Sequence, residues 1–269
     1  MVFSEEEKNF IIEKHFEGFT REQICGFLGI KTPIYITEVF KEKGLCTTGK
    51  RDRYPVNENY FSVIDSNEKA YWLGMMYSDG NIIKGNKGIQ LQLKDKAHLE
   101  KFKEALGAKN HKITESLDNR WSKKCYYYHF SVKSKKLAND LNNLGCTPNK
   151  SLTLEKIPDI PEEFILDFVR GYFDGDGSIH QTISGYRISF VGTQKFLREI
   201  QNILQVNTKI SNQGTGMAYV FQVTGNKQLL RILDDLYKTS SEKTRLTYKY
   251  NIYLEFCNLL GASPSNLEI

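Results

Sequence analysis

Two stretches of the chain lie 97 residues apart and read alike. Residues 71–80 are YWLGMMYSDG and residues 168–177 are FVRGYFDGDG, and in each a helical pattern of apolar residues ends in an aspartate and a glycine. Setting the first stretch on the second sets Asp79 on Asp176. Such a repeat constrains the fold strongly, because both copies are expected to adopt the same structure.

Shorter similarities follow these two stretches in the same order. IQLQL at residues 89–93 falls beside YRISF at 186–190 at the offset of 97, and both alternate as strands do. YHFSVKS at 128–134 resembles YVFQVTG at 219–225 in the same alternation. Each copy therefore predicts the order helix, two strands, helix, two strands, helix.

Each copy also ends near a lysine, Lys150 in TPNKSL and Lys249 in LTYKYN. A lone lysine at such a place is most simply an exposed loop residue, and its recurrence in both copies favours a functional role. The pattern predicts an α+β fold of two pseudo-symmetric αββαββα repeats with a small all-α unit before them. We place the N-terminal unit at 1–49, a basic linker at 50–59, the repeats at 60–157 and 158–262, and a tail at 263–269.

The two repeated helices share a pair of small residues four positions apart. These are Gly74 and Ser78 in the first helix and Gly171 and Gly175 in the second. Residues four apart lie on one helix face, so each helix offers a shallow groove where another backbone can approach closely. We expect the helices to pack through these grooves, which would bring their C-terminal ends together across a pseudo-two-fold axis.

That packing would place Asp79 beside Asp176 at two helix ends, where the helix dipoles disfavour a carboxylate. We expect the second helix to end at Asp176, with Gly177 as a left-handed stop. An isolated DGDG is often only a polar turn, and an EF-hand is excluded because Gly185 stands where the bidentate glutamate belongs. A divalent cation would offset the paired charges, and carboxylate and carbonyl oxygens are the ligands that Mg²⁺ prefers.

WLGMMYSDG and VRGYFDGDG resemble the two signature helices of the LAGLIDADG homing endonucleases, in their two-motif monomeric form. The resemblance covers roughly residues 60 to 260 and includes LNNLGCTPNKSLTL and the YKY near the end. It implies sheets that form a saddle over double-stranded DNA, with metal at the helix ends. Mg²⁺ is the expected cofactor, with Mn²⁺ able to substitute and Ca²⁺ able to bind.

The resemblance also implies site residues. They are the metal-binding catalytic acids Asp79 and Asp176, the carbonyl oxygens of Ser78 and Gly175, the active-site lysines Lys150 and Lys249, and Gln194, which matches a glutamine that orders water. The first copy departs from this pattern, because Ala97 faces Gln194 at the repeat offset. That leaves Lys94 or Lys96 as the candidate to replace the glutamine.

The strands carry a polar face suited to nucleic acid. In IQLQLK the apolar residues Ile89, Leu91 and Leu93 face one way and the polar residues face the other. The predicted DNA-contacting residues are Gln90, Gln92, Lys94, His129, Ser131 and Lys133 in the first copy, and Arg187, Ser189, Gln222 and Thr224 in the second. Their donors and acceptors can read base edges in a major groove. A solvated polar face, common in antiparallel sheets, is the alternative.

The N-terminal unit lies outside the repeat and predicts three short helices. Ser4 and Thr20 are the expected N-caps of the first two, and the third starts at Thr32 and Pro33. Two helices, a glycine-containing turn and a further helix resemble a helix-turn-helix unit, with residues 34–43 as recognition helix. A small packing appendage is the alternative.

Composition leans mildly toward polyanionic partners. The chain has 37 Lys and Arg against 32 Asp and Glu, a formal charge of +5. The linker residues expected along DNA phosphates are Lys50, Arg51 and Arg53. The five cysteines form no CxxC pair, which is typical of reduced thiols. Without a signal-peptide core or an apolar run of membrane length, we expect an intracellular protein, in cytoplasm or organelle matrix, with no membrane partner.

Three functions fit these patterns. The first is a monomeric, sequence-specific, Mg²⁺-dependent DNA endonuclease, a hydrolase of ester bonds that makes a staggered double-strand cut and serves intron homing or acts from a free-standing gene. The second is an RNA maturase, which uses the same fold to bind intron RNA. The third is a transcription regulator that combines the helix-turn-helix with an inactive nuclease fold. Retention of both aspartates and both lysines favours cleavage.

Overall fold

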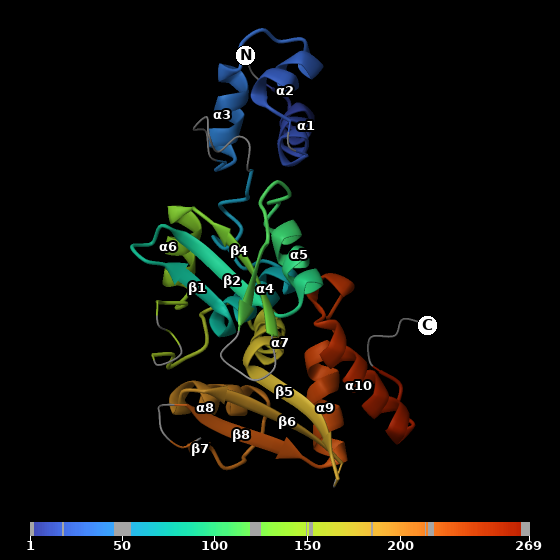
Figure 1. The fold of residues 1–269 in the computed structure, drawn as a ribbon. Helices are drawn as coiled ribbons and strands as arrows, with labels where there is room; N and C mark the ends of the chain where they lie inside the picture. Colours follow the sequence, from blue (N-terminus) through green and yellow to red (C-terminus); the bar gives the residue numbers. More distant parts are fainter. Residues whose placement is uncertain are drawn as a thin grey trace.

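The computed structural model describes residues 3–17, 19–45, 55–118, 125–148, 150, 153–183, 185–212, 214 and 218–264. Within them the predicted α+β architecture of two αββαββα repeats is confirmed (Figure 1). The first repeat comprises α4 (Asn67–Ser78), β1 (Gly80–Ile83), β2 (Gly88–Leu93), α5 (Lys96–Ala105), β3 (Thr114–Asp118), β4 (Cys125–Val132) and α6 (Lys135–Asn143). The second comprises α7 (Ile165–Asp176), β5 (Gly177–Thr182), β6 (Gly185–Gly192), α8 (Gln194–Ile203), β7 (Ser211–Asn212), β8 (Tyr219–Thr224) and α9 (Asn226–Tyr237), followed by α10 (Thr247–Leu260).

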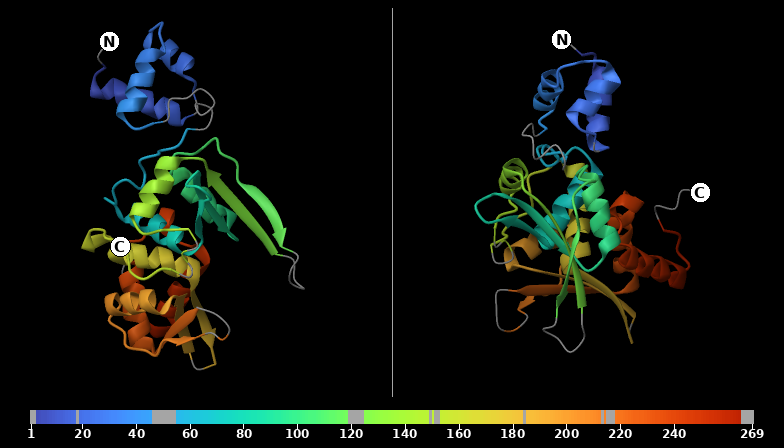
Figure 2. Two further views of the ribbon diagram at one scale, coloured as in Figure 1. Left: turned by 90° about the vertical axis from the view of Figure 1, so that its left-hand side faces the viewer. Right: turned by 45° about the horizontal axis from the view of Figure 1, so that its top comes forward.

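Each repeat builds one antiparallel four-stranded sheet, in the order β1-β2-β4-β3 or β5-β6-β8-β7. Helices α5 and α6 pack on one face of the first sheet, and α8 and α9 pack on the corresponding face of the second. Apolar strand residues such as Leu91 and Ile188 are buried beneath these helices. Figure 2 shows both sheets with their other face free of helices, and the β3–β4 hairpin projecting from the body.

Helices α4 and α7 make the most extensive contact between any two described elements. A Cβ added to Gly74 would lie 2.1 Å from the Phe168 carbonyl oxygen, and one added to Gly171 would lie 2.0 Å from the Tyr71 carbonyl oxygen. Phe168 and Tyr71 are themselves 97 residues apart, so the two contacts are related by the repeat. The expected packing through small residues is therefore confirmed, and the two helices share the central core.

The two strand hairpins differ in register by two residues. Gly80 pairs with Leu91 in the first repeat, whereas the equivalent Gly177 pairs with Phe190. Leu91 therefore corresponds to Phe190, and the expected equivalence of 89–93 with 186–190 is wrong. The cause is a longer hairpin in the second repeat, because β5 and β6 form six residue pairs where β1 and β2 form four.

A second correction concerns the end of α7. The helix ends at Asp176 as expected, but Gly177 has φ −93° and ψ 166°, an extended conformation that begins β5. Glycine is needed there for space and not for a left-handed turn, because an added Cβ would lie 2.3 Å from the ring of Phe173. The same holds in the first repeat, where a Cβ on Gly80 would collide with Met76.

The N-terminal unit contains the three expected helices, α1 (Glu5–Phe16), α2 (Arg21–Leu28) and α3 (Ile34–Glu42). Ser4 and Thr20 cap α1 and α2 in complete capping boxes, as predicted. The three helices bury a small core of their own around Ile11, Ile24 and Phe40. No helix in the described ranges is long and apolar enough to span a membrane.

Candidate active site

The site begins where the two central helices end. Asp79 is the C-cap of α4, and Asp176 is the last residue of α7. The ends adjoin, because a Cβ added to Gly175 would lie 2.5 Å from Asp79 Oδ2 and 1.9 Å from Ser78 Oγ. The structure thus brings Asp79 against the residue that precedes Asp176, as the groove packing predicts.

A buried lysine caps each of these helix ends. Lys150 Nζ donates to the Ser78 carbonyl oxygen at 3.0 Å and also to the Gly80 carbonyl oxygen. Lys249 Nζ donates to the carbonyl oxygens of Phe173 (2.5 Å), Asp174 (2.9 Å) and Gly177 (2.7 Å). Both side chains are almost fully buried. Each ammonium group therefore bonds carbonyl oxygens of the last helical turn and of the first residue of the following strand, and it offsets the negative end of the helix dipole.

The two aspartates and two lysines of the site influence one another's pKa values. Asp79 and Asp176 each keep a solvent-exposed surface, yet they are crowded by protein. Desolvation, and then the Asp176 charge, raise the pKa of Asp79 to about 7, while Lys150 and Lys249 oppose the rise. Desolvation also raises the pKa of Asp176 against the same two lysines. For Lys249, desolvation lowers the pKa to about 8, and nearby aspartates partly counter it.

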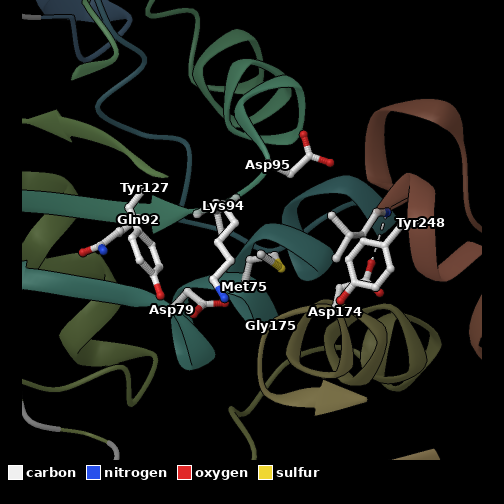
Figure 3. Close-up of a pocket in the computed structure, with 11 residues that line it drawn as sticks. Met75, Asp79, Gln92, Lys94, Asp95, Tyr127, Asp174, Gly175 and Tyr248 are labelled. Atoms are coloured by element: carbon white, nitrogen blue, oxygen red, sulfur yellow. Dashed lines mark hydrogen bonds between the residues drawn. The ribbon is translucent and has the colours of Figure 1, made fainter. Parts of the chain in front are cut away.

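A cleft of about 540 Å³ opens beside the Asp79 end (Figure 3). Residues from α4, the end of β2, β4, α7 and the start of α10 line it: Met75, Asp79, Gln92, Leu93, Lys94, Asp95, Tyr127, Asp174, Gly175, Leu246 and Tyr248. Figure 3 shows the Lys94 side chain extending into the cleft toward Asp79. The cleft therefore joins a helix end to the polar face of the first sheet.

The model of the LAGLIDADG-like domain family matches residues 163–237, which span α7 to α9. The second repeat is a LAGLIDADG-like domain. The match confirms the resemblance seen in VRGYFDGDG, and the pseudo-symmetric fold relates the first repeat to it. A search of the curated proteins gave no match to the chain.

Solved structures of similar fold include several LAGLIDADG proteins. The I-SmaMI homing endonuclease bound to cleaved DNA is 14% identical with a TM-score of 0.45, over 76% of this chain and 94% of that one. The meganuclease I-CpaMI bound to uncleaved DNA is 11% identical with a TM-score of 0.44, over 71% and 91%. The N-terminal LAGLIDADG domain of DUF199/WhiA is 13% identical with a TM-score of 0.43, over 72% and 92%.

One LAGLIDADG helix carries a buried acid that the sequence interpretation left outside the site. Asp174 is 3% exposed, and its Oδ2 accepts hydrogen bonds from Tyr71 Oη (2.7 Å) and the Leu246 amide (3.3 Å). Tyr71 Oη also contacts His98 Nε2 at 2.7 Å. Desolvation raises the pKa of Asp174, chiefly against Lys249. Asp174 thus ties α4 and α7 to the backbone that leads into α10.

The predicted DNA-contacting residues gather on the free faces of the two sheets. Gln90 lies opposite Ser131 and Gln92 opposite His129 in the first sheet. In the second sheet Arg187 lies opposite Thr224 and donates to Gln222 Oε1 at 3.2 Å. Lys133 follows β4 and is exposed. The exception is Ser189, which lies on this side but is only 8% exposed, with its hydroxyl 2.7 Å from that of Ser178.

The remaining predicted residues are less closely tied to the site. Gln194 is exposed at the start of α8, and its counterpart at the start of α5 is Lys96. The expected pairing of Gln194 with Ala97 is therefore off by one residue, because the second hairpin is two residues longer and the first repeat has one extra residue between β2 and α5. Lys50, Arg51 and Arg53 lie outside the described residues.

The donor set suits a hard cation with few protein ligands. Over the ranges that the structure describes, no group of three or more His, Cys, Asp and Glu side chains gathers. A metal ion here would depend on Asp79, Asp176 and the adjacent carbonyl oxygens, with water completing its shell. Mg²⁺ commonly binds through one or two carboxylates while keeping several waters. The Ser78 carbonyl already accepts from Lys150, so a metal would share it.

Sequence reasoning missed several residues around the cleft. Tyr248 and Tyr127 line it. Tyr248 directly precedes the predicted Lys249, and Tyr127 lies two residues before the predicted His129 on β4. Adjacency to a predicted site residue was thus the available signal. Asp174 offered a weaker one, because a second acid in DGDG is as common in a polar turn as in a buried network.

Proposed function

We propose that the protein is a sequence-specific DNA endonuclease of the homing type, which hydrolyses both strands of a long duplex with a staggered cut. The observation that carries this proposal is the pair of adjoining helix ends, where Asp79 lies against Gly175, the residue before Asp176, and a buried lysine caps each helix. The two ends are related by a pseudo-two-fold axis, and the two antiparallel strands of a duplex are related in the same way. Each end can therefore address one strand.

The sheets support the same partner. Their polar faces are free of covering helices and present amide, hydroxyl, imidazole and guanidinium groups, which suit base edges in a major groove. The net charge of +5 favours the phosphate backbone. Because a single chain supplies both halves of the saddle, we propose that it acts as a monomer.

Cleavage of each strand exchanges one oxygen bonded to phosphorus for another and moves two protons. The oxygen of a water molecule bonds to phosphorus and releases a proton to solvent, while one phosphorus–oxygen ester bond breaks and the leaving oxygen takes up a proton. A divalent ion, with Mg²⁺ as our proposal, would neutralise phosphate charge and make its bound water more acidic. Asp79 and Asp176, with the carbonyls of Ser78 and Gly175, would hold it.

The lysines have the complementary task. Lys150 and Lys249 sit at fixed positions through their hydrogen bonds to helix-end carbonyls, so their charge does not need to be reoriented during the reaction. All three donors of the Lys249 ammonium group are engaged by carbonyls, so its proposed role is to stabilise developing negative charge and not to give up a proton. Gln194 is proposed to order water on the second half.

The N-terminal unit is proposed to extend the DNA contact beyond the saddle, with α3 as recognition helix. The charge of this unit does not favour DNA binding, because residues 3–45 contain eight Glu against six Lys and Arg. The proposal therefore depends on the helix arrangement and on the exposed Lys31 and Lys41. Replacing both with glutamate is expected to weaken binding to the target duplex, and unchanged binding would leave the unit a packing appendage.

A cleavage selection tests the proposal. The full chain is incubated with a randomised duplex DNA library in Mg²⁺, beside an EDTA control and the double variant Asp79→Asn/Asp176→Asn. The proposal predicts enrichment of one long site, cut on both strands by the wild type alone. Selective retention of uncut duplex would instead indicate a regulator, and retention of a structured RNA would indicate a maturase.

A further inference from the structure

The two repeats differ by one inserted residue at the edge of the site. Leu93, the last residue of β2, pairs with Tyr128, and Gly192, the last residue of β6, pairs with Tyr219 in the equivalent position. In the second repeat the N-cap of the next helix, Thr193, follows at once. In the first repeat Lys94 stands between the strand and the N-cap Asp95. Lys94 therefore has no counterpart in the second half.

The insertion places a cation in the cleft. Lys94 continues the polar side of β2 after Gln90 and Gln92, so its side chain points to the free face of the sheet. It lines the same cleft as Asp79, and its Nζ lies 5.5 Å from the ring centroid of Tyr127. Figure 3 shows the amino group directed toward the α4 end.

Its charge is available to a ligand. Lys94 is exposed, whereas Lys150 and Lys249 are buried and bonded to helix-end carbonyls. A phosphate that approached Asp79 through this cleft would meet the ammonium group of Lys94 on the opposite wall.

We infer that Lys94 is a catalytic residue for one strand only, which stabilises charge on the scissile phosphate at the Asp79 end and makes the two cleavage sites unequal. This inference rests on the proposed endonuclease function. A lysine that merely contacts the DNA backbone would raise affinity, and its loss would slow both strands until the enzyme saturates the DNA. A lysine at one reacting phosphate changes the rate of that strand even at saturation.

The test uses the duplex enriched by the selection, with a different fluorophore on each strand, under single-turnover conditions with saturating enzyme. Lys94→Ala is expected to slow one strand by about 10-fold or more and to leave the other within about twofold, so that nicked duplex accumulates. Lys94→Arg, which keeps the charge, is expected to restore most of that rate. The matched control is Lys238→Ala, an exposed lysine at the end of α9 that lies beside Asp235 and does not line the cleft.

Equal slowing of both strands by Lys94→Ala, or no slowing at saturation, would overturn the inference while leaving the endonuclease intact. Cleavage of neither strand by the wild type would overturn the proposed function itself, and the inference with it. An unchanged melting temperature of the variant checks that the exposed side chain was not needed for folding.

Discussion

The two central helices, α4 and α7, have the same length and meet through matched glycines, yet they differ in what they bury. Helix α7 buries Asp167, Arg170 and Asp174. At the repeat offset of 97, α4 carries the uncharged residues Ala70, Leu73 and Tyr77. The backbone contact is thus symmetric, while only α7 buries a charged network. The fold therefore requires the close glycine contact in both helices, whereas the buried charges belong to the second half.

The buried charged network of α7 is expected to give the largest effect on stability. Arg170 Nη1 lies 2.7 Å from Asp167 Oδ1 and donates to the Leu236 carbonyl at 2.7 Å, and both side chains are buried. Arg170→Leu leaves Asp167 as an unpaired buried charge, so we expect a loss of about 3–5 kcal/mol of unfolding free energy in urea titrations.

The double variant Asp167→Ala/Arg170→Leu installs the residues of the first helix. Most of the stability should return, because a buried ion pair can often be replaced by apolar residues at little cost. A double variant as unstable as the single one would show that α7 cannot adopt the apolar solution of α4.

The glycine contact is expected to behave alike in both helices. Gly74→Ala and Gly171→Ala each drive a methyl group into a facing backbone carbonyl, so we expect a loss of about 3 kcal/mol in both. The control is Gly26→Ala in α2, where an added Cβ meets nothing within 4 Å. That change should be neutral or stabilise by up to about 1 kcal/mol. Thermal melts that separate the two helix variants widely would contradict the pseudo-symmetry.

The two tyrosine hydroxyls of α4 differ in their hydrogen-bond partners. Tyr71 Oη donates to Asp174 and contacts His98, whereas Tyr77 Oη donates to the Leu144 carbonyl. Tyr71→Phe removes a donor from a buried carboxylate and is expected to cost about 2 kcal/mol, against about 1 kcal/mol for Tyr77→Phe. Denaturation midpoints in the reverse order would argue against a special role for the Asp174 network.

The smallest expected effect is the pH dependence of the metal-free protein. Asp79 has a pKa of about 7 when folded, above the value of about 4 for an unfolded aspartate. The folded state therefore holds the extra proton, so stability is greatest at low pH and falls as the pH rises through 7. Asp79→Asn should melt at a higher temperature than the wild type at about pH 8 in EDTA, and at a similar one near pH 4.

Added Mg²⁺ should reverse that order at high pH. The cation binds the folded wild type and raises its melting temperature, while the Asn variant gains less. If millimolar metal leaves the wild type unchanged, the proposed metal site is not formed by the protein alone.

How much of this could be predicted from sequence depends on the range of the interaction. The repeat, the helix ends at Asp79 and Asp176, and the close packing at Gly74 and Gly171 follow from local periodicity and from small residues at fixed spacing. The strand register could not be obtained by extending the helix offset, because hairpin length is set by the turn, and two extra residues shift every later equivalence. That shift, reduced by the one residue inserted after β2, pairs Gln194 with Lys96 and not with Ala97.

The buried polar contacts could not be predicted from the sequence pattern either. The partners of Asp174 are Tyr71 on the other helix and the Leu246 amide, which are distant in the chain and carry no motif. The sequence named Lys94 both as a DNA-contacting residue and, with Lys96, as a replacement for the glutamine, and the structure places Lys94 in the cleft beside Asp79.

Strand-resolved cleavage by Asp79→Asn and Asp176→Asn, each compared with wild type on the selected duplex in Mg²⁺, tests the central claim most directly. If the two helix ends form the catalytic centre, each variant should lose roughly 100-fold or more in rate on at least one strand while still binding the duplex. A variant that cuts both strands at the wild-type rate would contradict the account.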